Sequence, residues 1–213
     1  MCFSYEASVI SLLVGTISST AVFLLGSTFD KIMGAWFFYI SLMQGVDAVL
    51  WKHQTCDAFH KSVSYWGSLL NSSQPLMLGI LVLLFNRKLS YPGIVGGIMA
   101  LVTGYGIYKS FVQHPDLYYC TQPRPTDPHL VWNWTTQSTY LVDWLVYLSS
   151  IYVISLLGLP TLTQGVLFSN GMLVGLLVTG LVYPRESIGS LWCYFTALTP
   201  PFYLAYRTMG YTI

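Results

Sequence analysis

The sequence has very few charged residues for its length. Asp, Glu, Lys and Arg together make up 8% of its 213 residues, while 54% of the chain is apolar. An ordinary soluble domain has about 25% charged residues. So few charges cannot cover a surface that faces water, which excludes a soluble globular protein. The charges are also clustered, and the long uncharged runs between them are typical of membrane-spanning segments.

Several signatures of known chemistry are missing as well. There is no Gly-rich phosphate loop, no Gly-x-Ser-x-Gly elbow and no basic nucleic-acid patch, so we expect no nucleic-acid partner and no catalytic activity of those classes. The last apolar segment has no lysine, which excludes a rhodopsin-like retinal Schiff base. The last three segments have no histidine, which argues against the seven-span zinc hydrolases of membrane lipids. We therefore predict a protein that is not an enzyme and has no cofactor, with zinc as the one exception considered below.

Seven long apolar windows are present. A helix needs about 20 residues to cross a hydrocarbon core of roughly 30 Å, and only two windows contain a formal charge, Asp47 and Asp143. A membrane barrel would show alternating segments of about ten residues, and these windows do not alternate. We predict an all-α polytopic bundle, a single domain over residues 1–213, with seven transmembrane helices at 7–28, 32–51, 62–86, 90–108, 138–158, 164–183 and 188–206. Residues 1–6 lack the basic region of a signal peptide, so we expect the first helix to be retained.

Seven spans divide the polar segments between two sides of the membrane. Side A receives the N-terminus and the loops 52–61, 109–137 and 184–187, with five Lys and Arg residues and every histidine. If the adjoining ends of the spans are included, every cysteine and seven of the eight acids also lie toward side A. Side B receives three short connections and the C-terminal tail, with four Lys and Arg in far fewer residues. The positive-inside rule then predicts an extracytoplasmic N-terminus and a cytoplasmic C-terminus.

Two features of the side A loops fit this orientation. Asn133-Trp134-Thr135 is a glycosylation sequon in the long loop, where an extracytoplasmic segment can be modified. Cys56 and Cys120 both lie in side A loops, so they either form a disulfide in an oxidising compartment or stay as two free thiols.

The pattern S-x-W-x8-P-x2-L occurs twice. It runs from Ser64 through Pro75 in the third predicted span and from Ser190 through Pro201 in the seventh, where Pro200 precedes the second proline. These positions correspond in a 3+1+3 arrangement of three-helix repeats around a linker helix. Proline-broken helices at matching positions are typical of transporter binding sites, although chance could also produce the pattern.

Short motifs near both ends of the chain carry a family resemblance. They are Met1-Cys2-Phe3-Ser4, Gln44-Gly45, Leu50-Trp51, Pro75-Leu76 and Gly189-Ser190-Leu191-Trp192-Cys193. Together they resemble an uncharacterised group of small multi-pass membrane proteins that begin Met-Cys-Phe-Ser, with bacterial and large-DNA-virus members. The resemblance implies an acid just before the glycine of the second span, where this chain has Gln44, and it implies no activity.

Polar residues inside the spans are the first candidates for a binding site, because an ionisable group in hydrocarbon costs several kcal/mol unless it is buried or paired. Asp47 and Asp143 lie at similar depths from side A, so both carboxylates could face one vestibule. Gln44, Asp47 and Trp51 share a helical face that could bind a solute or ion. Alternatively, the two aspartates cap helix ends or hold neighbouring spans together.

A second candidate site follows the second span. His53, Cys56, Asp57 and His60 lie at i, i+3, i+4 and i+7, and they would share one face if the helix continued beyond the membrane. Imidazole, thiolate and carboxylate are zinc ligands, so a zinc site is one hypothesis. A disulfide at Cys56 would remove one ligand, and polar residues collect in loops for other reasons.

Three further expectations concern packing. Prolines in the 109–137 loop predict an ordered, largely non-helical lid whose aromatic residues rest on the membrane surface. Trp and Tyr near most span ends are typical of interface belts. Gly93, Gly96, Gly97, Gly104 and Gly106 predict a helix that packs closely against its neighbours.

Two functions remain open. One is a transporter-like or channel-like passage protein for a small solute or ion, entered from side A. The other is a non-catalytic structural protein of a viral or organellar membrane, which forms homo-oligomers or binds a protein partner through the 109–137 loop. A metal-dependent membrane enzyme is a distant third. In each case the lipid bilayer is the first partner.

Overall fold

The computed structural model describes residues 4–112, 119–124, 127–135, 140–182 and 188–211. The predicted all-α class is confirmed for them, because helices and one short hairpin account for most of these residues. The elements are α1 (Tyr5–Leu24), α2 (Thr28–Lys52), α3 (Ala58–Ser72), α4 (Gln74–Phe85), α5 (Pro92–Val112), β1 (Gln122–Arg124), β2 (Asp127–Val131), a 3-10 turn (Asn133–Thr135), α6 (Tyr140–Gly158), α7 (Leu162–Val182), α8 (Ile188–Ala197) and α9 (Thr199–Thr208).

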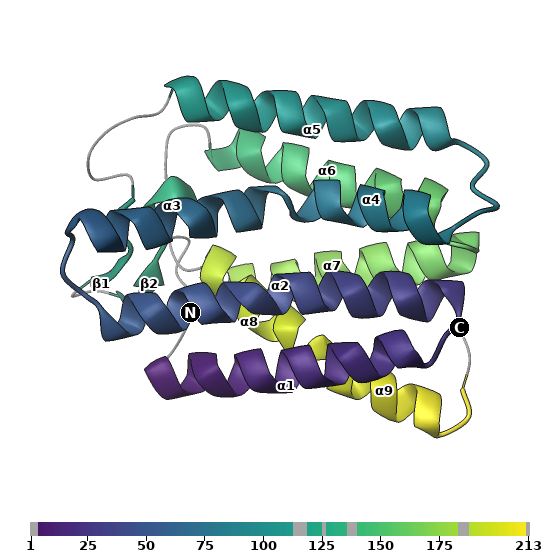
Figure 1. Ribbon diagram of the computed structural model, residues 1–213, viewed down its shortest axis with the longest axis horizontal. Helices are drawn as coiled ribbons and strands as arrows, with labels where there is room; N and C mark the ends of the chain where they lie inside the picture. Colours follow the sequence, from purple (N-terminus) through teal and green to yellow (C-terminus); the bar gives the residue numbers. More distant parts are fainter. Residues whose placement is uncertain (1–3, 113–118, 125–126, 136–139, 183–187, 212–213) are drawn as a thin grey trace.

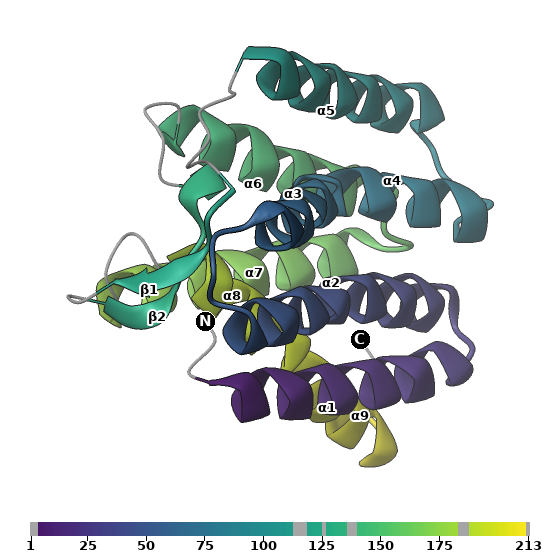
Figure 2. The same cartoon turned by 60° about the vertical axis from the view of Figure 1, so that its left-hand side comes forward.

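Successive helices run in opposite directions along one axis, as Figure 1 shows, and α3–α4 and α8–α9 each form one interrupted rod. Helices α1, α3, α6 and α8 begin at one end of the bundle, which we call the side A end. Helices α2, α5 and α7 begin at the opposite, side B end. The antiparallel hairpin β1–β2 lies at the side A end (Figure 2).

The first turn of the bundle shows how local chemistry sets helix ends. Gly26 has a φ of +94°, a left-handed conformation that favours glycine. Ser27 then caps α2, because its hydroxyl accepts a hydrogen bond from the backbone N–H of Asp30 at 3.0 Å and the Asp30 side chain bonds back. The first two predicted spans therefore had their shared boundary about four residues too late.

The core is centred on α2. This helix packs against α1, α3, α4 and α8, and its side chains Trp36, Ile40 and Met43 are fully buried. Close contact between α1 and α2 depends on Gly34, where an added Cβ would lie 2.5 Å from the backbone nitrogen of Phe23.

Three helices are long and apolar enough to cross a membrane, namely α1, α2 and α7. The pair α3–α4, bent by 47° at its break, is a fourth if it counts as one span. The other three predicted spans correspond to α5, α6 and α8–α9, which the same criteria of length and apolarity do not include among the described residues. Three or four candidate spans are thus supported, and seven are not established.

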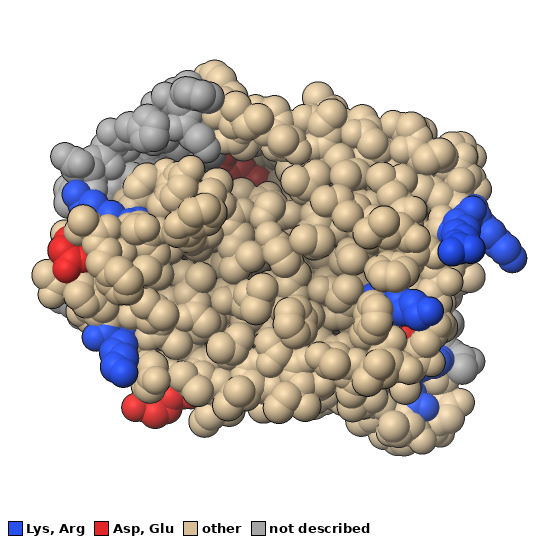
Figure 3. All heavy atoms as spheres, viewed as in Figure 1, with Lys and Arg blue, Asp and Glu red and all other residues tan. Residues whose placement is uncertain are grey.

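The surface of the bundle fits a hydrocarbon environment. Large apolar side chains point outward from three helices: Ile17 on α1 is 68% exposed, Leu101 on α5 is 74% exposed and Leu181 on α7 is 86% exposed. Figure 3 shows charged atoms at the two ends of the bundle and an almost uncharged face between them. Soluble monomers rarely expose apolar surface on this scale.

Helix α5 does not pack as its glycines predicted. It lies at the edge of the bundle (Figure 2), against α4 and α6. A Cβ added at Gly93, Gly96, Gly97 or Gly104 would meet nothing within 4 Å. These glycines therefore face open space, and close helix contacts are instead made at Gly34 and at Gly165, whose added Cβ would lie 2.6 Å from the carbonyl oxygen of Ser155.

Both predicted helix breaks are present. Ser73 separates α3 from α4 with φ −87° and ψ 0°, and Leu198 separates α8 from α9 with φ −90° and ψ −1°. Pro75 and Pro200 each follow their break by two residues, and Pro201 follows its break by three.

Candidate functional site

A pocket lies beside the break between α3 and α4. Pro75 has no backbone N–H, and its ring would clash with the carbonyl oxygen four residues earlier in a continuous helix, so the helix bends there. Ser73 stabilises the break, because its side chain bonds the carbonyl oxygen of Leu69 at 2.7 Å and the Tyr39 hydroxyl at 2.6 Å. The broken helix thus forms one wall of the pocket.

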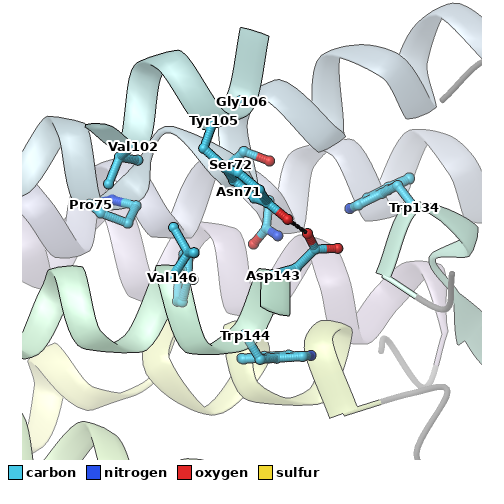
Figure 4. Close-up of a pocket in the computed structure, with 11 residues that line it drawn as sticks. Asn71, Ser72, Pro75, Val102, Tyr105, Gly106, Trp134, Asp143, Trp144 and Val146 are labelled. Atoms are coloured by element: carbon cyan, nitrogen blue, oxygen red, sulfur yellow. Dashed lines mark hydrogen bonds between the residues drawn. The ribbon is translucent and has the colours of Figure 1, made fainter. Parts of the chain in front are cut away.

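The other walls come from α5, α6 and the 3-10 turn after the hairpin. The pocket has a volume of about 80 Å³, room for a few water molecules or one small solute. Figure 4 shows side chains from all these elements converging on it. The lining residues are Asn71, Ser72 and Pro75 from the α3–α4 break, Val102, Tyr105 and Gly106 from α5, Asp143, Trp144, Val146 and Tyr147 from α6, and Trp134.

Asp143 and Tyr105 form the central polar pair of the pocket. The Tyr105 hydroxyl donates a hydrogen bond of 2.6 Å to Oδ1 of Asp143 (Figure 4), which fixes the direction of the carboxylate. Asp143 lies in the first turn of α6, where the helix dipole favours a negative charge. Among the described lining residues Asp143 carries the only formal charge. An acidic side chain is visible in Figure 3 at the bottom of a hollow in the uncharged face.

Aromatic rings make up much of the remaining wall. Trp144 and Tyr147 pack edge to face at 5.9 Å between ring centroids. Trp134 stacks on Trp132 with 5.1 Å between the ring centroids. Both rings belong to residues 119–124 and 127–135, here called the hairpin segment, and this segment is held against the bundle. Because these rings are packed against other rings, they form a rigid wall around the carboxylate.

Gln74 does not line the pocket but holds the lining residue Tyr147, and it was not singled out from the sequence. It is fully buried at the start of α4. Its side-chain oxygen accepts from the Tyr147 hydroxyl, and its carbonyl oxygen accepts from Nε1 of Trp36 at 3.1 Å. The sequence did offer a signal for Gln74, which is a polar residue directly before a proline inside an apolar span. A proline break leaves backbone groups without their helical partners, and a nearby polar side chain can bond them.

Asp47, the other predicted carboxylate, lies outside the lining of this pocket. Its side chain is fully buried, and Oδ1 accepts a hydrogen bond of 2.9 Å from Nε1 of Trp132. The two aspartates therefore do not face a common open vestibule. Trp132, which bonds Asp47, stacks on Trp134, which lines the pocket together with Asp143. Asp47 holds the segment after the hairpin onto α2.

The other residues on the predicted face of α2 point into the protein as well. Gln44 is fully buried. Trp51 is half-buried and packs beside Leu191 of α8. This face therefore contacts other helices, and among the predicted solute-binding residues Asp143 is the one that lines the pocket.

Of the two alternatives for Cys56 and Cys120, the structure has the disulfide, with the two Cα atoms 5.6 Å apart. Helix α2 does not continue past the membrane as the zinc hypothesis required, because His53 ends it and Asp57 caps α3. Nε2 of His53 bonds Oδ2 of Asp57 at 2.8 Å. The backbone N–H of His60 and the His53 side chain lower the pKa of Asp57.

His60 connects this loop to the hairpin segment. One of its ring nitrogens, Nδ1, lies 2.7 Å from the carbonyl oxygen of His53, and the other, Nε2, accepts from the backbone N–H of Thr121 at 3.0 Å. In the described part of the chain, no three His, Cys, Asp or Glu side chains are placed to hold one metal ion. Of the four predicted zinc ligands, His53 and Asp57 bond each other and Cys56 is in the disulfide.

The hairpin segment is held against the bundle rather than resting on a membrane surface. Trp132 is 1% exposed and Trp134 is 3% exposed, so the predicted interfacial placement of these two rings is wrong. The side chain of Asn133, the predicted glycosylation site, donates to the carbonyl oxygen of Cys120 and accepts from Nη2 of Arg124 at 3.0 Å.

The side B end is held by a buried ion pair. Asp30 is fully buried at the start of α2, and its carboxylate accepts from Nη2 of Arg207 at 3.1 Å and from the Tyr203 hydroxyl at 2.6 Å. Both donors belong to α9, the half-helix beyond the second break. This contact joins the two halves of the chain at the end opposite the hairpin.

No protein-family model, no curated protein and no solved structure matches this chain.

Proposed function

We propose that the protein is a multi-pass membrane protein that passes a small solute or ion, and that the pocket beside Pro75 is its binding site. The observation that carries the proposal is the Asp143 carboxylate in an aromatic pocket at a proline-broken helix. Broken helices place backbone and side-chain polar groups inside a membrane where they can meet a ligand.

The proposal includes seven membrane crossings. Four are the candidate spans α1, α2, α3–α4 and α7, and the other three are α5, α6 and α8–α9. Its support is that all seven rods run along one axis and that charged atoms gather at the two ends (Figures 1 and 3). Helix α5 has 21 residues and α6 has 19, lengths of about 30 Å at 1.5 Å per residue.

We place side A outside the cytoplasm. The disulfide between Cys56 and Cys120 and the sequon at Asn133 lie in side A segments, and disulfides persist in oxidising compartments. The few side B residues carry four basic side chains, which fits a cytoplasmic face.

The arrangement resembles one state of an alternating-access cycle. Asp143 lies in the first turn of α6, near side A, while Asp30, Tyr203 and Arg207 close the side B end. The rods α3–α4 and α8–α9 each contain a break, so a movement of the half-helices α4 and α9 could open side B while closing side A.

The test is a flux screen in proteoliposomes with small sugars, common cations and protons. Wild type is compared with Asp143→Asn and with Asp57→Asn, a matched acid-to-amide control that lies outside the pocket and still caps α3. We expect a flux that Asp143→Asn removes and that Asp57→Asn leaves unchanged. A flux that survives Asp143→Asn would contradict the assignment of the pocket.

A structural membrane protein is the second candidate. It is favoured by the structural use of Asp47 and by the open glycine face of α5 at the bundle edge. No flux of any solute by folded, inserted protein would favour this function over passage.

A further inference from the structure

The chemistry of the pocket lining indicates which class of solute it would accept. Four aromatic residues line it, namely Tyr105, Trp134, Trp144 and Tyr147, together with the carboxylate of Asp143. Aromatic rings attract cations through the negative charge over their faces, and several rings around one site are typical of ammonium recognition. A carboxylate adds a full negative charge at the same place.

An inorganic cation is a poor match for this lining. Calcium requires six to eight oxygen ligands, and magnesium requires a complete octahedron. Two of the hydroxyl groups in the pocket are already donors, since Tyr105 donates to Asp143 and Tyr147 donates to Gln74. The few oxygens that remain cannot replace the hydration shell of such an ion.

A neutral solute would gain no charge interaction with the Asp143 carboxylate. None of the described lining residues is basic, so a cationic ligand meets no like charge among them. Val102, Val146 and Pro75 add apolar surface, which suits methyl or methylene groups. The lining thus combines a charge for a cation with apolar surface for its substituents.

We propose that the solute of this pocket is a small organic ammonium ion, with its charged nitrogen at the Asp143 carboxylate and its substituents against the aromatic rings. This inference rests on the proposed function, because it takes the pocket as the solute site. Tyr105 acts as a positioning residue, since its hydroxyl orients the carboxylate through the 2.6 Å hydrogen bond. Trp134 and Trp144 lie beside that carboxylate (Figure 4) and would form the cation-binding surface.

The test is isothermal titration calorimetry of purified protein with three probes. Choline carries the quaternary ammonium group, and 3,3-dimethyl-1-butanol is its neutral analogue of the same shape. Potassium ion is the inorganic competitor. We expect choline to bind at least about tenfold more tightly than the alcohol, since tenfold corresponds to about 1.4 kcal/mol. Potassium should not displace it.

Variants locate the binding to this pocket. Asp143→Asn should weaken choline binding by about tenfold or more and leave the alcohol unaffected, because only the charge is removed. Trp144→Leu should weaken choline binding several-fold. Trp66→Leu is its matched control, since Trp66 is 64% exposed and does not line the pocket, and it should bind choline as wild type does.

The outcomes separate this inference from the proposed function. Equal binding of choline and the alcohol, displacement by potassium, or choline binding that Asp143→Asn does not change would overturn the ammonium assignment. If choline does not bind but another solute shows a flux that depends on Asp143, the ammonium inference is wrong and the proposed function stands. If folded protein shows neither binding nor flux, the proposed function itself fails.

Discussion

Replacing Gly34 by alanine should weaken the contact between α1 and α2. The added Cβ would lie 2.5 Å from the backbone nitrogen of Phe23, 2.7 Å from its Cα and 2.7 Å from the carbonyl oxygen of Ser19. All three are backbone atoms, so no side chain can rotate to make room. The two helices would have to separate by roughly 1 Å, and overpacking of this kind costs about 1–3 kcal/mol.

Thermal unfolding in detergent, followed by tryptophan fluorescence, measures this effect. For a chain of this size about 1 kcal/mol shifts Tm by roughly 2–4 °C, so we expect a fall of roughly 2–12 °C. Gly96→Ala on α5 is the matched control, because its added Cβ meets nothing within 4 Å. If the two variants unfold at the same temperature, the close α1–α2 contact described above is wrong.

Three further predictions concern the ends of the bundle. Arg207→Met should lower the free energy of unfolding by about 3 kcal/mol, because it leaves Asp30 buried without its cation. Denaturant titration measures this change, and if the Asp30→Asn/Arg207→Met double variant loses as much free energy of unfolding as Arg207→Met, the prediction is contradicted. Hydrogen bonds lower the pKa of Asp57 below its ordinary 3.8, so its stabilisation is complete at neutral pH and is lost as the pH falls through the lowered value. The Tm difference between wild type and Asp57→Ala should therefore shrink in acid, and a difference that grows would refute this reasoning. Replacing Cys56 and Cys120 by serine should cost about 2–4 kcal/mol, since the bond spans 64 residues; equal denaturation midpoints would show that the disulfide does not constrain the unfolded chain.

The positions of the helices could be predicted from hydropathy, because each rod of the bundle coincides with one apolar window. Their ends could not, because caps and turns set them. The boundary between the first two helices moved to residues 25–27 through Gly26 and the Ser27–Asp30 capping box. The break between α3 and α4 was predicted correctly from Pro75, because the missing backbone N–H of proline disrupts a helix whatever its neighbours in the fold are.

The candidate site could be predicted only in part. Asp143 was identified as a charge inside an apolar window, and it does line the pocket. Its partner Tyr105 was not identified, because 38 residues separate the two in sequence and only packing of α5 on α6 brings them together. Asp47 looked equivalent to Asp143 in the sequence. In the structure, however, its carboxylate accepts a hydrogen bond from Trp132, which lies 85 residues away in sequence.

The glycines of α5 show a similar limit of sequence reasoning. A small-residue pattern predicts that a helix can approach another closely, but it does not say whether a neighbour is there. In the described structure that neighbour is absent at Gly93, Gly96, Gly97 and Gly104, which lie in open space.

The most direct test of the pocket uses two cysteine substitutions on α5. Gly106 lines the pocket and Gly96 does not, and neither added side chain would clash. In proteoliposomes, membrane-impermeant thiol reagents applied from side A should modify Gly106→Cys but not Gly96→Cys, relative to protein without an added cysteine. A cationic methanethiosulfonate should react faster than an anionic one, and Asp143→Asn should remove that preference. No reaction at Gly106→Cys, or a charge preference that Asp143→Asn leaves unchanged, would contradict a water-filled, cation-attracting pocket on side A.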